Sequence, residues 1–159
     1  MEDAAGTGEA NRRDGAHGGT YTLLTDLDVD EPAVVTFGAV GERELPPGRY
    51  AYTGSAHGPG GFARIDRHRR VAAGDHDVRH WHVDYLLGHP DAQLVVAVRS
   101  PGVDAECAIA RATVVVATGC ESVPGVGASD CCCSSHLAFA RRGPGLERAV
   151  RRAHDRARG

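Results

Sequence analysis

The order of apolar and polar residues predicts a chain that begins with strands. Runs rich in β-branched and aromatic residues lie at 20–27 (TYTLLTDL), 33–40 (AVVTFGAV) and 49–54 (RYAYTG), and Pro- and Gly-containing turns separate them. Strands joined by short turns usually pair with their neighbours in the sequence. We therefore expect these three strands to form an antiparallel meander.

Beyond residue 60 the apolar spacing changes from that of strands to that of helices. Phe62, Ile65 and Val71 lie at roughly helical intervals, and Asp104 can cap a later helix. The segment from 119 to 135 shows neither period and is expected to be a loop. The predicted elements are helices at 62–73, within 80–89, at 106–118 and at 144–158, and a strand at 94–100.

Length and composition place these elements in one α+β domain, a small and mainly antiparallel sheet flanked by helices. A chain of 159 residues with 42% hydrophobic residues can bury a core without cross-links. We expect a disordered tail at 1–18, a folded domain at 19–140 and a basic C-terminal helix at 141–159. No apolar run approaches the ~20 residues of a membrane span, and the N-terminus lacks a signal-like pattern, so a cytoplasmic location without membrane partners is expected.

The cysteines form a second recognisable pattern. There are five, an odd number, and three are consecutive, which does not suit a disulfide framework. Reduced thiols or metal ligands are expected instead. A zinc cluster is one interpretation, and a buried turn with small apolar thiols is the other. The residues that could contribute to the cluster are His80, His82, Asp84, Asp130, Cys131, Cys133 and His136.

The most informative residues are two tyrosines in similar glycine-containing segments. Gly19-Thr20-Tyr21 opens the first predicted strand, and Tyr52-Thr53-Gly54 ends the third. Arg64 follows on the next helix, where His68 shares its face because the two are four residues apart.

This set resembles the GIY-YIG nuclease superfamily, in which two neighbouring strands present the tyrosines and a following helix supplies the arginine. The segments GSA at 54–56, RIDRH at 64–68, WHVDYLL at 81–87, EC at 106–107 and GASDCCCSSHLAF at 127–139 sharpen the resemblance. Together they are similar to one family within it, the domain of unknown function number 123, found mainly in archaea and some bacteria. The distance between the tyrosine motifs is longer than usual, so an extra strand or hairpin must fit between them.

The resemblance implies metal-dependent hydrolysis of DNA phosphodiesters. Tyr21 would be the base or orient the water, Tyr52 would orient the phosphate, and Arg64 would stabilise its charge. His68 would relay a proton, and Glu106, assigned by its order in the chain, would bind Mg²⁺ or Mn²⁺. Some relatives carry the domain beside an endonuclease III-like glycosylase, which implies a role in DNA repair and a glycosylase partner.

Two other functions remain open at this point. A net charge of −3 is weak support for DNA binding, but basic residues are clustered. The helix at 62–73 carries a local charge of +3 from four arginines and Asp66, and we expect Arg67, Arg69, Arg70 and Ser55 to contact nucleic acid. Residues 141–158 carry +5 from seven arginines and two acids. The alternatives are a non-catalytic nucleic-acid-binding module and a metal-stabilised interaction domain.

Overall fold

The computed structural model describes residues 18–58, 60–75, 82–116, 121–123, 126, 135–141 and 143–159. The expected tail therefore lies outside the described residues except for Gly18. Within them, none of the helices combines the length and the apolar character needed to cross a membrane.

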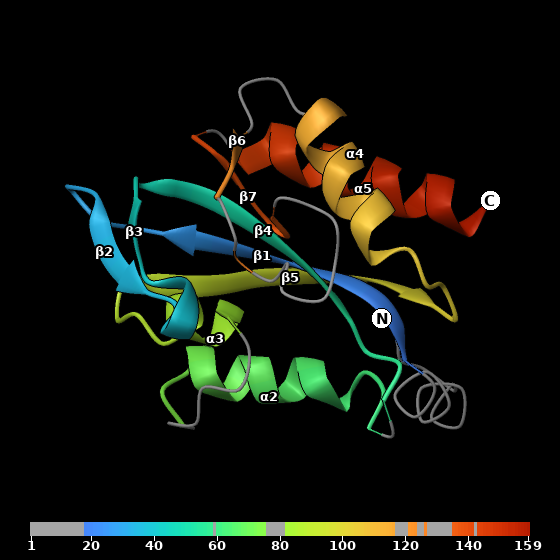
Figure 1. Ribbon diagram of the computed structural model, residues 1–159, viewed down its shortest axis with the longest axis horizontal. Helices are drawn as coiled ribbons and strands as arrows, with labels where there is room; N and C mark the ends of the chain where they lie inside the picture. The colour runs from blue at the N-terminus through green and yellow to red at the C-terminus, as the bar shows by residue number, and fades with distance from the viewer. Residues whose placement is uncertain are drawn as a thin grey trace.

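A five-stranded antiparallel sheet in the order β5-β1-β4-β7-β6 forms the centre of the domain (Figure 1). Strand β1 (Gly19–Leu27) pairs with β4 (Gly48–Ser55) on one side and with β5 (Ala92–Pro101) on the other. Strand β7 (Leu137–Ala140) pairs with β4 and with the short β6 (Glu121–Ser122). The α+β class expected from the sequence is confirmed.

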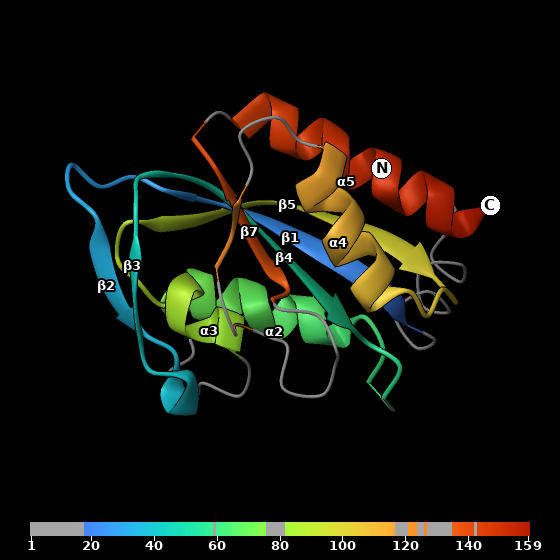
Figure 2. The same cartoon turned by 45° about the horizontal axis from the view of Figure 1, so that its top comes forward.

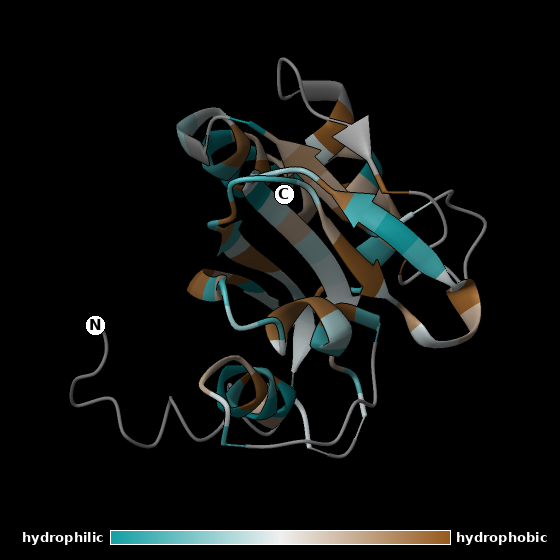
Figure 3. Ribbon diagram, turned by 90° about the vertical axis from the view of Figure 1, so that its left-hand side faces the viewer, coloured by the Kyte–Doolittle hydropathy of each residue, from teal (hydrophilic) through white to brown (hydrophobic). Residues whose placement is uncertain are grey.

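The region between the tyrosine motifs is a separate hairpin. Strand β2 (Ala33–Thr36) pairs with β3 (Glu42–Leu45) across the 3₁₀ helix η1 (Gly38–Val40), and neither joins the main sheet. Figure 3 shows β2 as mostly hydrophobic and β3 as mostly hydrophilic, with the side chain of Leu45 fully buried. The predicted meander was therefore wrong, but the extra hairpin expected between the tyrosines is present.

Helices cover both faces of the main sheet (Figures 1 and 2). Helices α2 (Ala63–Ala72) and α3 (His82–Leu87) lie on one face, and α4 (Glu106–Val116) and α5 (Gly143–Arg158) lie on the other. These helices correspond to the predicted ones within a few residues. The strand β7, LAFA, was not predicted, because four apolar residues show no alternation from which a strand could be recognised.

The alternation of β1 divides the core into two clusters, one on each face. Tyr21, Leu23 and Leu27 belong to the cluster between the sheet and helices α2 and α3. Leu24 belongs to the cluster between the sheet and helices α4 and α5. Because neighbouring residues of a strand point to opposite faces, the consecutive residues Tyr21 and Thr22 enter different halves of the domain.

Candidate active site

Three buried polar side chains form a hydrogen-bonded chain on the α2 side of the sheet. The Tyr21 hydroxyl lies 2.9 Å from Nε2 of His68, and Nδ1 of His68 lies 2.8 Å from Oδ1 of Asp84. All three residues are fully buried. A carboxylate only accepts hydrogen bonds, so Nδ1 of His68 carries the proton and Nε2 can accept one from Tyr21.

The local backbone explains how the tyrosines reach this position. Tyr21 is paired with Gly54 across β1 and β4, and Leu23 is paired with Tyr52, so both tyrosine rings lie on the same face. A Cβ at Gly54 would lie 2.8 Å from the Tyr21 ring and 2.9 Å from Tyr52. Glycine at 54 therefore leaves the space that the two rings occupy.

Arg64 reaches the same tyrosines from the first turn of α2. Its guanidinium donates a hydrogen bond to the Ser55 carbonyl oxygen and approaches the Tyr21 hydroxyl. Burial raises the pKa of Tyr21 well above its usual value, as does the nearby Tyr52, and the positive charge of Arg64 opposes that rise. Tyr21 is therefore a neutral phenol at physiological pH.

Glu106 begins α4 and is the fifth member of the predicted set. Burial raises the pKa of Tyr52, the negative charge of Glu106 raises it further, and Arg64 opposes the rise. Glu106 and Arg64 thus both lie within electrostatic range of Tyr52. Oε2 of Glu106 is 3.4 Å from Nδ1 of His136, and Nε2 of His136 is 3.5 Å from the Cys107 sulfur.

The described members of the predicted second cluster do not form one group. Asp84 is bonded to His68, whereas His136 lies beside Glu106. Among the residues the structure describes, no three His, Cys, Asp or Glu side chains are arranged to hold a metal ion. Cys107 is disulfide-bonded, which corrects the expectation of reduced thiols for that residue. His82 is half-buried at the start of α3, and the remaining predicted members, His80, Asp130, Cys131 and Cys133, lie outside the described residues.

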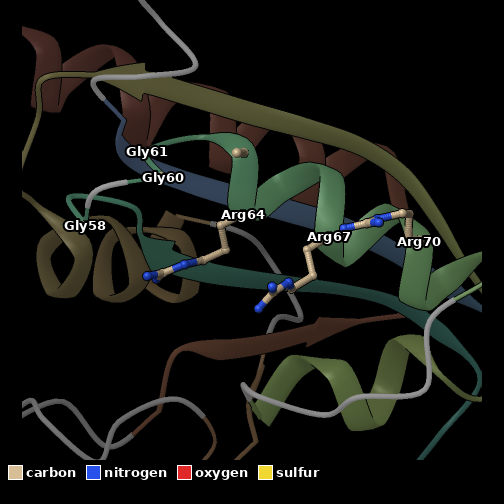
Figure 4. A pocket seen from close by; sticks show the side chains of 7 residues that line it. Gly58, Gly60, Gly61, Arg64, Arg67 and Arg70 are labelled. Carbon is tan, nitrogen blue, oxygen red and sulfur yellow. The ribbon is translucent and has the colours of Figure 1, made fainter.

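Arginines on α2 line a pocket of about 320 Å³ together with the glycine loop that precedes the helix (Figure 4). Arg64, Arg67 and Arg70 project from successive turns, with Arg64 nearest the loop. No acidic residue is among the lining residues that the structure describes. Arg69, also predicted to contact nucleic acid, pairs with Asp66 at 3.6 Å, and neither residue lines the pocket.

The opposite face of the sheet contains a buried histidine that the sequence analysis did not identify. Nε2 of His154 lies 2.8 Å from Oγ1 of Thr22, and Nδ1 lies 2.8 Å from Oγ of Ser100. Thr22 also contacts Thr53, and Arg158 donates to Ser100. One signal was present in the sequence, because His154 follows Leu146 and Val150 at intervals of four and so occupies the buried face of α5.

The fold and this site define a small α+β domain with two buried tyrosines, Tyr21 and Tyr52, in its main sheet. Arg64 from α2 and Glu106 from the first turn of α4 both lie near Tyr52. The family described as "Domain of unknown function DUF123" matches residues 20–159, so the chain belongs to that family. No curated protein and no solved structure matches the chain.

Proposed function

We propose that the protein is a metal-dependent nuclease that cleaves phosphodiester bonds of DNA, with a role in DNA repair. The observation that carries the proposal is the Tyr21–His68–Asp84 chain with Arg64 beside its tyrosine. A phenol beside an imidazole that a carboxylate orients has the parts of a proton relay. An arginine beside it supplies the positive charge that phosphate chemistry requires.

The relay would operate without an ionised tyrosine. As water attacks phosphorus, its proton passes to the Tyr21 oxygen while the Tyr21 proton passes to Nε2 of His68. Asp84 stabilises the imidazolium that forms, because its carboxylate already accepts the Nδ1 hydrogen. The raised pKa of Tyr21 makes this coupled transfer necessary, since the phenol alone would not lose its proton near neutral pH.

Arg64 and Tyr52 would bind the phosphate that is cleaved. A guanidinium can donate to two non-bridging oxygens at once, and the hydrogen bond to the Ser55 carbonyl holds Arg64 in place before the substrate arrives. The Tyr52 hydroxyl, neutral because burial raises its pKa, can donate to a third oxygen.

Glu106 fits the metal that the superfamily implies. Its side chain is 28% exposed at the start of α4, so an ion with its water ligands can reach the carboxylate. The buried Nδ1 of His136, which has no hydrogen-bond partner among the residues that the structure describes, faces the same carboxylate. A divalent ion held there would neutralise charge on the phosphate.

The arginine pocket would bind DNA next to the reacting phosphate. Arg67 and Arg70 follow Arg64 at intervals of three residues, about 4.5 Å along a helix axis. The three guanidinium groups thus form a basic row that begins at the active site. DNA-repair substrates and the glycosylase partner are parts of the proposal that rest on the resemblance alone.

A second candidate function is nucleic-acid binding without cleavage. The burial of the two tyrosines favours this function. Tyr21 is fully buried, Tyr52 is only 5% exposed, and neither lines the arginine pocket. Cleavage requires substrate binding to open access to these hydroxyls, whereas binding along α2 does not.

The experiment that separates the two functions measures cleavage of plasmid, single-stranded and branched DNA by the purified chain with Mg²⁺ or Mn²⁺. Wild-type protein should cleave at least one substrate, and a folded Arg64→Ala variant should be slower by about 100- to 1000-fold, as for the loss of one preorganised donor.

Arg69→Ala is the matched control, because Arg69 lies on the same helix but is exposed and paired with Asp66. It should retain wild-type cleavage. If no DNA is cleaved but DNA is bound, the binding module is supported, and if Arg64→Ala cleaves like wild type, Arg64 has no part in the chemistry.

A further inference from the structure

We infer that Glu106 and His136 bind one divalent cation together, and that the imidazole makes this site prefer Mn²⁺ to Mg²⁺. The inference rests on the proposed function only in that it specifies the metal of the same site, since metal binding can be measured without cleavage. The sequence predicts separate sites for Glu106 and His136, whereas Oε2 of Glu106 and Nδ1 of His136 lie 3.4 Å apart.

The His136 ring is buried beside the Glu106 carboxylate. Its side chain is 1% exposed, and Nδ1 is one of two buried side-chain polar atoms without a hydrogen-bond partner among the described residues. Leaving such an atom without a partner destabilises the folded state. The atom instead faces the negatively charged Glu106 carboxylate.

The contact with Cys107 indicates which ring nitrogen of His136 carries a hydrogen. Nε2 lies 3.5 Å from the sulfur of Cys107, which is disulfide-bonded and therefore has no hydrogen to donate. Nε2 must then be the donor in this contact, which leaves Nδ1 as the ring nitrogen that can bind an ion. A cation shared between Nδ1 and the Glu106 carboxylate satisfies both atoms, and a divalent metal ion is the cation that the proposed function requires.

The distance between Oε2 of Glu106 and Nδ1 of His136 suits two ligands of one ion. Two ligands at right angles around an ion, each about 2.1 Å from it, lie about 3 Å apart, close to the observed separation. The backbone also fixes the position of His136, because its amide donates to the Val126 carbonyl at 2.8 Å and its carbonyl accepts from Thr53 at 3.0 Å. The ligand pair is therefore held in place before an ion arrives.

The preference between metals follows from the ligand types. Mg²⁺ prefers oxygen ligands and retains its waters, whereas first-row transition ions, including Mn²⁺, accept imidazole nitrogen more readily. Glu106, which is partly exposed, leaves the remaining positions to water or phosphate oxygens.

Two measurements on the full chain test the inference. The first is titration calorimetry with MnCl₂ and with MgCl₂, comparing wild type with His136→Gln and Glu106→Gln. We expect one Mn²⁺ site in wild type and weaker Mg²⁺ binding. His136→Gln should lower Mn²⁺ affinity about 10-fold or more and change Mg²⁺ affinity far less, whereas Glu106→Gln should weaken both.

His57→Gln is the matched control. His57 also lies near a carboxylate, 3.7 Å from Asp104, but it is exposed. Mn²⁺ affinity should be unchanged in this variant, and an equal loss in His57→Gln and His136→Gln would contradict the assignment.

The second measurement needs no variant and so remains valid if His136→Gln fails to fold. Pulsed electron paramagnetic resonance of Mn²⁺-loaded wild-type protein should show coupling to an imidazole nitrogen, and its absence would overturn the inference. Nitrogen coupling without cleavage of any DNA would support this site and contradict the nuclease, whereas cleavage without nitrogen coupling would do the reverse.

Discussion

Two histidines lie on opposite faces of the same strand, both fully buried and both hydrogen-bonded through each ring nitrogen. His68 contacts Tyr21 and Asp84, and His154 contacts Thr22 and Ser100. Only the partners differ. A carboxylate stabilises a protonated imidazole, whereas hydroxyl groups do not.

The difference assigns separate roles to the two faces of the sheet. Burial lowers the pKa of His154 to about 4, and the positive charges of Arg158 and Arg151 lower it while Asp155 opposes them. His154 is therefore neutral at physiological pH and joins α5 to the sheet. In the proposed function His68 accepts a proton while the Asp84 carboxylate stabilises it, so the proposed chemistry lies on that face of the sheet.

The largest predicted effect is the difference in DNA cleavage rate between variants of His68 and of His154. His68→Gln should reduce DNA cleavage by about 100-fold or more, because a positioned acid–base group typically contributes 10²- to 10⁴-fold. Folded His154→Gln should cleave within a few-fold of wild type. Single-turnover rates with saturating Mn²⁺ test this, and equal losses in the two variants would remove the distinction between the faces.

We expect the protonation of His154 to make the folded protein less stable as the pH falls. Its folded-state pKa, about 4, is below the ordinary value of 6.5, so between these values the unfolded chain binds the extra proton. The stabilisation is present in full above about pH 6.5 and is lost as the pH falls toward 4, up to about 3 kcal/mol.

Urea unfolding at pH 7.5 and 5 measures this loss. His154→Gln should show a smaller decrease between the two pH values than wild type does, and His57→Gln, at an exposed site, should behave like wild type. A variant at 154 with the wild-type pH dependence would show that another group is responsible.

A matched pair of substitutions compares how much the hydrogen bond at Nδ1 of His68 and the one at Nδ1 of His154 each contribute to the free energy of unfolding. Asp84→Ala removes a charged acceptor from His68, and Ser100→Ala removes a hydroxyl from His154. The free energy of unfolding should fall by about 1.5–3 kcal/mol in the first case and by about 0.5–1.5 kcal/mol in the second. Chemical denaturation at pH 7.5 measures both, and the reverse order would contradict the stronger pairing of His68.

The smallest predicted effect compares the arginines of the two faces. Replacing Arg67 and Arg70 by Ala should lower the salt dependence of DNA binding by about 1.4–1.8 in the slope of log K against log salt, which corresponds to two phosphate contacts. Replacing Arg152 and Arg156, both exposed on α5, is the control and should change the slope less. A larger loss in the α5 variant would place the DNA on the other face.

The sequence predicted the parts of the fold and site that local patterns encode. The strands at 20–27 and 49–54 and most helices followed from apolar spacing, and the tyrosine motifs identified Tyr21, Tyr52 and Arg64. These three residues do lie together, although whether they catalyse a reaction is still a prediction. The extra hairpin followed from the length of chain between the motifs.

Contacts between distant segments could not be read from spacing. Asp84 was grouped with the cysteines because it lies beside His82 in the chain, but the packing of α3 against α2 brings it to His68. His154 is 132 residues from Thr22, and no local pattern reveals that pairing. The meander predicted from spacing did not include the pairing of β1 with β4, which only the family resemblance implied, because the intervening hairpin forms its own sheet.

The most direct test of the central claim removes one oxygen atom from each of two buried tyrosines. Tyr21→Phe deletes the hydroxyl that contacts His68, and Tyr50→Phe deletes a hydroxyl that donates to the Pro46 carbonyl at 2.6 Å. Both side chains are fully buried. With Mn²⁺ and a cleavable DNA, Tyr21→Phe should be slower by about 100-fold or more, with unchanged DNA affinity, and Tyr50→Phe should match wild type. Cleavage by folded Tyr21→Phe at the wild-type rate would contradict the proposed role of the Tyr21–His68–Asp84 chain.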